Sequence, residues 1–451
     1  MPLNPFRTAD VPLMARPAFA AEMRHMALWG VFAGLVEGNT SSIVVAKTFQ
    51  ASELLTTVVW TTPMLANMLS LWSAAAIRGR RRTPLFLWLA AGAILGFASV
   101  GLTPADWAPW GGWLFAAQVA FARVMLAALL TVRTSIWNAN YPAAQRAHLS
   151  GRLQRLRLAV GLLAGSGVGL LFDVDPAHYR WVYPLVGVIA TISLLPVRRL
   201  KVRHESRYVA QFRAARRGQP SVIGTLRESW HVLRQDRAFA SYCSAQYFLG
   251  SANFMVDPIL LVILTQRLEF SYLAAAALLD LLPNAILLFT IGAWARHFDR
   301  VGVLRFRVGN SWIWLASCIL AMLGVALLQF STPSSEALLR SPLAWTAVAL
   351  LIAARAFNGV GRSGGAIAWN LGHLHFADRQ QADLYMGIHV ALTGVRGLIM
   401  PFVALLMFRW IGWWALAIAT LSCAVALRQF SRLAADADSR EFAVVDGDES
   451  P

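Results

Sequence analysis

Two arginines in apolar surroundings are the residues of this chain best suited to chemistry. Arg355 is followed after thirteen residues by Trp-Asn, and Arg123 is followed at the same interval by another Trp-Asn, 232 residues earlier. A lone buried charge is costly, so each arginine needs a partner. Each half of the chain supplies an acid in an apolar segment, Glu37 for Arg123 and Asp257 for Arg355. Protonating such an acid breaks the ion pair, which would couple a proton gradient to a movement of helices. The alternative is a permanent ion pair that fixes the register of two helices.

Other polar side chains also interrupt apolar segments. Asp280 joins the four residues above as a candidate for proton coupling. The candidates for a substrate pathway are Asn39, Asn253, Asn284, His389 and Arg396. A different reading of the same pattern is that Arg123, Arg355 and Arg396 bind an anionic substrate directly, because the planar guanidinium fork suits carboxylate and phosphate.

The elements that must position these residues are membrane-spanning helices. Of the 451 residues, 57% are hydrophobic and only 14% are charged, against about 25% charged in a soluble protein. Apolar segments of about 17–25 residues predict bilayer-spanning helices. Twelve are predicted, over 23–46, 54–77, 84–103, 112–134, 155–172, 179–196, 239–264, 272–296, 306–330, 343–368, 385–408 and 411–431.

The basic residues lie mainly on one side of this predicted topology. The termini and the even-numbered connections carry 24 Lys or Arg, and the other connections carry only Lys47, Arg267, Arg340 and Arg409. The positive-inside rule therefore predicts that both termini are cytoplasmic. We expect a multi-pass protein of a bacterial inner membrane. The net charge of +17 then favours contact with anionic lipid headgroups instead of nucleic acid.

The repeat and the charge distribution predict four parts of the chain. Residues 1–197 form an N-terminal six-helix bundle, and residues 239–431 form a pseudo-symmetric C-terminal bundle. Between them, residues 198–238 form a basic cytoplasmic linker with an interface helix. Residues 432–451 form an acidic cytoplasmic tail. The fold class is thus all-α and integral to the membrane.

Local sequence patterns resemble the major facilitator superfamily of transporters. Between spans eight and nine, Gly292, Asp299-Arg300 and Gly302 are similar to the loop signature of that family. In span ten, Arg355 and Gly359 resemble the fourth-helix Arg-x-x-x-Gly pattern. The resemblance implies twelve helices in two bundles and alternating access to a central site.

The resemblance also implies roles for particular residues. Asp299, Arg300 and Gly302 would form a gate, and Glu37 with Arg123 would be the acid–arginine pair of proton-coupled members. Glycines of span five, Gly161, Gly165 and Gly169, resemble an antiporter pattern, although Ser166 stands in place of its proline. Export in exchange for protons is therefore slightly favoured, while glycines at this spacing also permit close helix packing.

Three functions are compatible with these patterns. The leading one is secondary transport of a small organic solute coupled to protons. The second is transport of an organic or phosphorylated anion. The third is a membrane sensor or scaffold that retains a transporter fold. An enzyme is not expected, since the sequence has no nucleophile–base or nucleotide-binding motif. His373 and His375 could bind a divalent metal, but an interfacial hinge is favoured, so no metal and no cofactor are expected. We expect a monomer.

Overall fold

The structure is a computed structural model that describes residues 6–77, 80–214, 222–329, 341–377 and 382–447. These residues form helices and their connections, and none of them lies in a strand. Within this part of the chain, nine helices are long and apolar enough to cross a membrane. The number is ten if the bent pair α1 (Arg16–Val36) and α2 (Thr40–Lys47) forms one span. The chain is thus an all-helical, multi-pass membrane protein, as predicted.

The expected twelve spans are consistent with this structure, because within the described residues each predicted range lies mostly on helix. One continuous stretch, Tyr272–Leu328, contains the eighth and ninth spans. It includes α12 (Leu282–Leu328), which breaks at Gly302, where φ is +71°. Only glycine adopts this left-handed conformation without steric cost, so Gly302 turns the chain from one span into the next.

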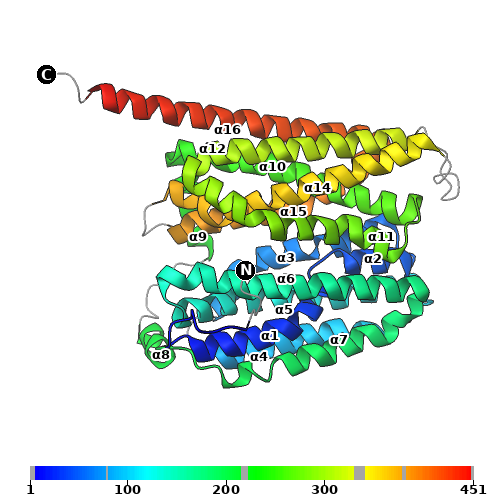
Figure 1. Cartoon of the computed structure of the whole chain (residues 1–451), viewed down its shortest axis with the longest axis horizontal. Helices are drawn as coiled ribbons and strands as arrows, with labels where there is room; N and C mark the ends of the chain where they lie inside the picture. The colour runs from blue at the N-terminus through cyan, green and yellow to red at the C-terminus, as the bar shows by residue number, and fades with distance from the viewer. Residues whose placement is uncertain (1–5, 78–79, 215–221, 330–340, 378–381, 448–451) are drawn as a thin grey trace. The chain divides into compact units, whose positions relative to one another are not determined.

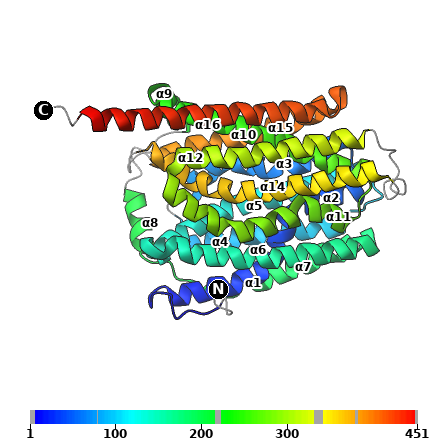
Figure 2. The same cartoon turned by 45° about the horizontal axis from the view of Figure 1, so that its top comes forward.

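The described residues divide into two units, each described here by itself. Unit 1 comprises residues 1–220 and 270–281, and unit 2 comprises residues 221–269 and 282–451. The long helices of each unit run roughly along one direction (Figures 1 and 2). The short segment 270–281 groups with the first unit although it follows the seventh span in sequence. The predicted boundaries at 197 and 239 stay predictions.

Unit 1 is built from seven principal helices. After α1 and α2 come α3 (Glu53–Ile77), α4 (Arg82–Ala98), α5 (Trp110–Asn140), α6 (Ala143–Val174) and α7 (Tyr179–Ser193). Helix α8 (Glu205–Ala214) follows in the basic linker. Segment 270–281 adds α11 (Tyr272–Ala276) and the π-helical turn η5 (Ala277–Leu281).

Unit 2 begins in the linker with α9 (Val222–Gln235). Its long helices are α10 (Arg237–Val262), α12, α14 (Pro342–Leu371), α15 (Ala382–Ile411) and α16 (Trp414–Gly447). A π-helical turn, η4 (Ile263–Arg267), ends α10. Helix α16 packs against α10 and α12 (Figures 1 and 2). At the start of α10 the Asp236 carboxylate caps the helix by accepting the backbone N–H of Phe239 at 2.8 Å.

Glycines bring α1 and α6 into close contact. A Cβ atom on Gly34 would lie 2.5–2.9 Å from backbone atoms of Gly161, and one on Gly30 would meet Val160 and the carbonyl of Arg157. Such distances leave no room for a side chain, so the two backbones touch directly. Gly169 plays a similar part further along α6, where a Cβ would lie 3.0 Å from the Cα of Leu273. The glycines of span five therefore serve helix packing in this structure.

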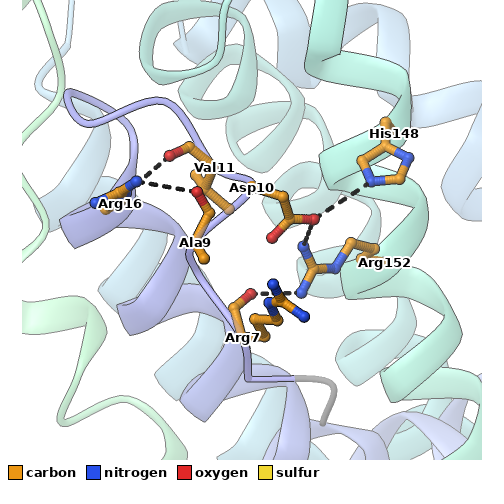
Figure 3. Close-up of polar contacts among 7 residues, drawn as sticks. All are labelled: Arg7, Ala9, Asp10, Val11, Arg16, His148 and Arg152. Atoms are coloured by element: carbon orange, nitrogen blue, oxygen red, sulfur yellow. Dashed lines mark hydrogen bonds and ion pairs between the residues drawn. The ribbon is translucent and has the colours of Figure 1, made fainter. Parts of the chain in front are cut away.

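The N-terminal segment folds back onto the beginning of α6 (Figure 3). Arg152 of α6 donates to the Asp10 carboxylate at 2.8 Å and to the carbonyl of Arg7 at 2.6 Å. Arg16 closes the turn by donating to the carbonyls of Val11 and Ala9. Apolar contacts complete this hook, because Val11 and Ala15 belong to a buried cluster that also contains Phe19, Met23, Leu149 and Leu153.

Candidate functional site

Arg355 and Asp257 form a buried ion pair inside unit 2. Nη1 of Arg355 on α14 donates to Oδ1 of Asp257 on α10 at 2.6 Å. The Arg355 side chain is only 2% exposed. Pro258 follows Asp257 within α10, and a proline there removes one backbone hydrogen bond of the helix. The predicted acid–arginine pair of the second half is therefore present, on a helix whose hydrogen bonding is interrupted beside it.

Arg123, the repeat equivalent of Arg355, has neutral partners. Its guanidinium donates to the carbonyls of Val36 and Gly38 at 2.7 and 2.9 Å. It also donates to the carbonyl of Val59 and to Oγ1 of Thr62, both at 2.7 Å. These four bonds use one buried side chain to connect α5 with α1, with the α1–α2 break and with α3.

The local sequence explains why carbonyls are free to meet Arg123. Helix α1 ends at Val36, and the axis turns by 44° before α2, so carbonyls at the break lack their intrahelical donors. In α3, Pro63 lies four residues after Val59 and has no N–H to offer its carbonyl. Arg123 thus supplies donors where the backbone cannot, which is a structural task that needs the whole guanidinium fork.

Glu37 lies at the α1–α2 break but faces α6. Its Oε2 accepts a hydrogen bond from Nη1 of Arg157, and Nε of Arg157 donates to Gln154 at 2.7 Å. Among the described residues, the other carboxylate oxygen of Glu37 is buried without a hydrogen-bond partner. The structure therefore brings Glu37 to Arg157 and gives Arg123 other acceptors, whereas the sequence pattern had predicted a Glu37–Arg123 pair.

Asp280, in segment 270–281, binds Asn39 at the break between α1 and α2. Its carboxylate accepts the backbone N–H of Asn39, and Nδ2 of Asn39 donates to its other oxygen at 2.9 Å. Two more contacts hold this segment within unit 1. Asp173 at the end of α6 accepts the backbone N–H groups of Tyr272 and Leu273, and Lys47 donates to the carbonyl of Phe270. Asn39 and Asp280, predicted for different roles, lie together.

Arg396 is a buried arginine with spare hydrogen-bonding capacity. It is 6% exposed, and Nη1 donates to the carbonyl of Gln246 on α10. Its guanidinium fits against Gly250, where any side chain would collide with it, and lies 5.8 Å from the ring centre of Phe254. Nε is buried without a partner, and no carboxylate of the described residues forms an ion pair with it. His389, two helical turns earlier on α15, also has a buried ring nitrogen, Nε2, without a partner.

The remaining predicted residues take no part in the contacts described above. Asp299 and Arg300 are exposed, and neither takes part in an ion pair among the residues that the structure describes. Asn253 on α10 and Asn284 on α12 are half-buried. His373 is buried and His375 is exposed, in the turn η6 (Gly372–His375).

Two polar residues of the site were missed from sequence. Arg157 lies near the start of the fifth span, where an arginine is normally attributed to the membrane interface. Asp173 lies at the end of that span and was counted as loop. The signal for Arg157 was its spacing of four residues from Gly161, the glycine that touches α1. That spacing places both residues on one face of α6.

Comparisons with known proteins identify the architecture. No model of a protein family matches the chain, and no curated protein is detectably similar in sequence. Solved structures are similar over nearly the whole chain. A point mutant of the nucleoside transporter NupG is 12% identical with a TM-score of 0.61, covering 93% of this chain and 99% of its own. A bacterial homologue of the iron transporter ferroportin, in its inward-facing state, has 12% identity and a TM-score of 0.60, with coverage of 93% and 98%.

A third similar structure is a D-xylose–proton symporter. It is 13% identical with a TM-score of 0.63, and the match covers 92% of this chain and 96% of the symporter. Identities this low establish the fold and leave the activity to be argued from the site. The chain therefore has the fold of these transporters, which is the fold that the resemblance to the major facilitator superfamily implied.

Proposed function

We propose that this protein is a secondary transporter that moves a small organic solute by alternating access and couples the movement to protons. The observation that carries the proposal is the buried Asp257–Arg355 pair. An ion pair in an apolar interior is stable only while both members are charged, so protonating Asp257 leaves Arg355 without its counter-charge. Unit 2 must then rearrange or provide another partner, and this requirement couples proton binding to conformation.

The similar structures support transport as the activity, because their names include a nucleoside transporter and a D-xylose–proton symporter. The protein acts in a bacterial inner membrane with both termini in the cytoplasm, a topology supported by the uneven distribution of Lys and Arg. It works as a monomer.

The test is transport by the purified protein in proteoliposomes. A panel of radiolabelled sugars, nucleosides, peptides and organic acids is assayed with and without a pH gradient. We expect Asp257→Asn to retain solute exchange and to lose accumulation driven by the gradient. Asp106→Asn is the matched control, because the Asp106 side chain is largely exposed and its removal should leave both activities unchanged.

Two results would contradict the proposal. Gradient-driven accumulation by Asp257→Asn at the wild-type level would exclude this carboxylate from coupling. Failure of the wild-type protein to move any solute of the panel, although it is folded and inserted, would favour the sensor or scaffold function.

A second candidate function, transport of an organic or phosphorylated anion, is favoured by Arg396. Arg123 has four acceptors and Arg355 has Asp257, whereas Arg396 is buried with Nε unsatisfied. An anionic oxygen would satisfy this group and supply the missing counter-charge. Under this function, Arg396→Gln weakens binding of anionic solutes by roughly 30–4000-fold, because losing one partner of a buried charge pair costs about 2–5 kcal/mol. Arg428→Gln, an exposed arginine of α16, serves as control. Equal losses for neutral and anionic solutes would show a merely structural role.

A further inference from the structure

A cavity at one end of unit 1 has walls with a single sign of charge. It lies where α1, the end of α7 and the following segment meet, and its volume is about 1270 Å³. Figure 1 shows α1, α4 and α7 next to one another in this unit. Five basic residues line the cavity, and no acidic residue does: Arg24, Arg198, Arg199, Lys201 and Arg203. We call this cavity the basic groove. Its cations suit a ligand with phosphate oxygens.

The backbone that carries these cations is held in place. Asn140 of α5, only 2% exposed, donates to the carbonyl of Lys201 and accepts the N–H of Arg203, both at 3.1 Å. Thr83 donates to the carbonyl of Leu200 at 3.0 Å. The groove is thus preorganised, which lowers the entropic cost of binding. In addition, Nη2 of Arg203 is buried without a hydrogen-bond partner in the described part of the chain.

A second cavity adjoins the basic groove. It lies between α4 and α7, has a volume of about 430 Å³ and shares Leu195 and Arg198 with the basic groove. Its other walls are almost entirely apolar, formed by Pro84, Leu87, Trp88, Ala91, Thr191 and Leu194. We call it the apolar groove. Trp88 is 78% exposed, as expected for an aromatic residue at the level of the headgroups.

We propose that the two grooves together bind one anionic phospholipid. The phosphate of the headgroup lies in the basic groove, and the first part of an acyl chain lies in the apolar groove, with Arg198 at their junction. A free phosphate or a soluble phosphorylated metabolite would use only the first groove. The continuity of the two through Leu195 and Arg198 is what selects a lipid. This site does not depend on the proposed transport function.

The electrostatic contribution of the groove can be measured by removing two cations. Each Lys or Arg near an anionic membrane surface strengthens binding about fivefold, so the double variant Arg199→Gln/Lys201→Gln should bind about thirtyfold more weakly. The full-length protein in detergent is titrated with phosphatidylglycerol or cardiolipin, and binding is followed by native mass spectrometry and by thermal unfolding. Phosphatidylcholine, which has no net charge, is the reference lipid.

Two further variants separate lipid binding from general effects. Arg155→Gln/Arg180→Gln removes the same charge at exposed positions outside both grooves and should bind anionic lipid as the wild type does. Ala91→Phe fills the apolar groove without changing charge and should also weaken binding of anionic lipid. Unchanged unfolding temperatures in phosphatidylcholine confirm that every variant is folded.

The proposal has clear contrary outcomes. Inorganic phosphate or glycerol phosphate that stabilises the protein as well as phosphatidylglycerol does would identify a soluble anion as the ligand. An equal loss of lipid binding in the control double variant would show a diffuse effect of net charge. Wild-type lipid binding by Ala91→Phe would separate the two grooves and overturn the assignment.

Discussion

Nη1 of Arg355 lies 2.6 Å from Oδ1 of Asp257, whereas Arg123, at the equivalent position of the repeat, binds three backbone carbonyls and a threonine hydroxyl. In both halves the arginine lies near the middle of a long helix, α5 or α14, but its hydrogen-bond partners differ. The first arginine stabilises interrupted helices. The second is neutralised by a group that can take up a proton. The two halves therefore have the same architecture and different chemistry.

The Asp257–Arg355 pair should show strong coupling in a double-mutant cycle. Removing either member breaks the buried ion pair, which costs about 3–5 kcal/mol of stability. Asp257→Asn and Arg355→Gln should each lower the unfolding temperature in detergent, and the double variant should lose less than their sum. Additive losses would mean that the two side chains do not act as a pair.

Replacing Arg123 by lysine should not preserve stability. A lysine ammonium is a compact point charge and cannot reach acceptors on α1 and α3 together. Each buried carbonyl left without a donor costs about 1–3 kcal/mol. We expect Arg123→Lys to unfold at a clearly lower temperature than the wild type, while Arg180→Lys at an exposed site does not. Full stability of Arg123→Lys would show that charge alone suffices at this position.

Hydropathy was sufficient to predict the helices, and the internal repeat with the family resemblance was sufficient to predict the fold. Whether a segment can span the bilayer follows from the polarity of its own residues, which can be read from the sequence. The partner of Glu37 was not predictable in the same way. It depends on the break after Val36 and on the close approach of Gly34 to Gly161, which turn the carboxylate towards Arg157. Contacts of this kind are set by packing between distant segments, and neither periodicity nor composition records them.

The close contact of α1 with α6 predicts a contrast between two glycines. In Gly34→Ala the new methyl group would lie within 2.5–2.9 Å of the Gly161 backbone, so the helices must separate. Overpacking of this kind costs about 1–3 kcal/mol. Gly167 lies on α6, and a Cβ atom there would have no neighbour within 4 Å, so Gly167→Ala should be neutral or slightly stabilising. Thermal unfolding of the two variants measures the difference, and equal behaviour would argue against the α1–α6 contact.

The N-terminal hook should loosen in acid. Burial raises the pKa of Asp10, but hydrogen bonds from its own backbone and from Arg152, with the charge of Arg152, bring the pKa below its ordinary value. A lowered pKa stabilises the fold above the pKa of the unfolded chain, about 3.9, and this contribution is lost as pH falls through the folded value. Because Asp10 is half exposed, the effect on overall stability is small.

Hydrogen exchange is the suitable measurement for the hook, since it reports local opening. Protection of residues 9–16 should fall below about pH 4 in the wild type. At neutral pH, Asp10→Asn should lower it by the same mechanism, while Asp106→Asn should not. Protection that is insensitive to both acid and Asp10→Asn would mean that the apolar side chains of the hook suffice.

Glu37 and Arg157 provide the test of which half carries the proton. Their pair lies where α1 and α6 touch through Gly34 and Gly161, so the two side chains cannot separate without opening a packed contact. This geometry favours the role of an ion pair that fixes helix register, and it leaves coupling to Asp257.

Glu37→Gln and Arg157→Gln should therefore each lower the unfolding temperature, with less than additive loss in the double variant. Both single variants should still accumulate solute in response to a pH gradient. If Glu37→Gln instead keeps wild-type stability and loses the response to the gradient, Glu37 is the coupling carboxylate, as its position in the first span had suggested.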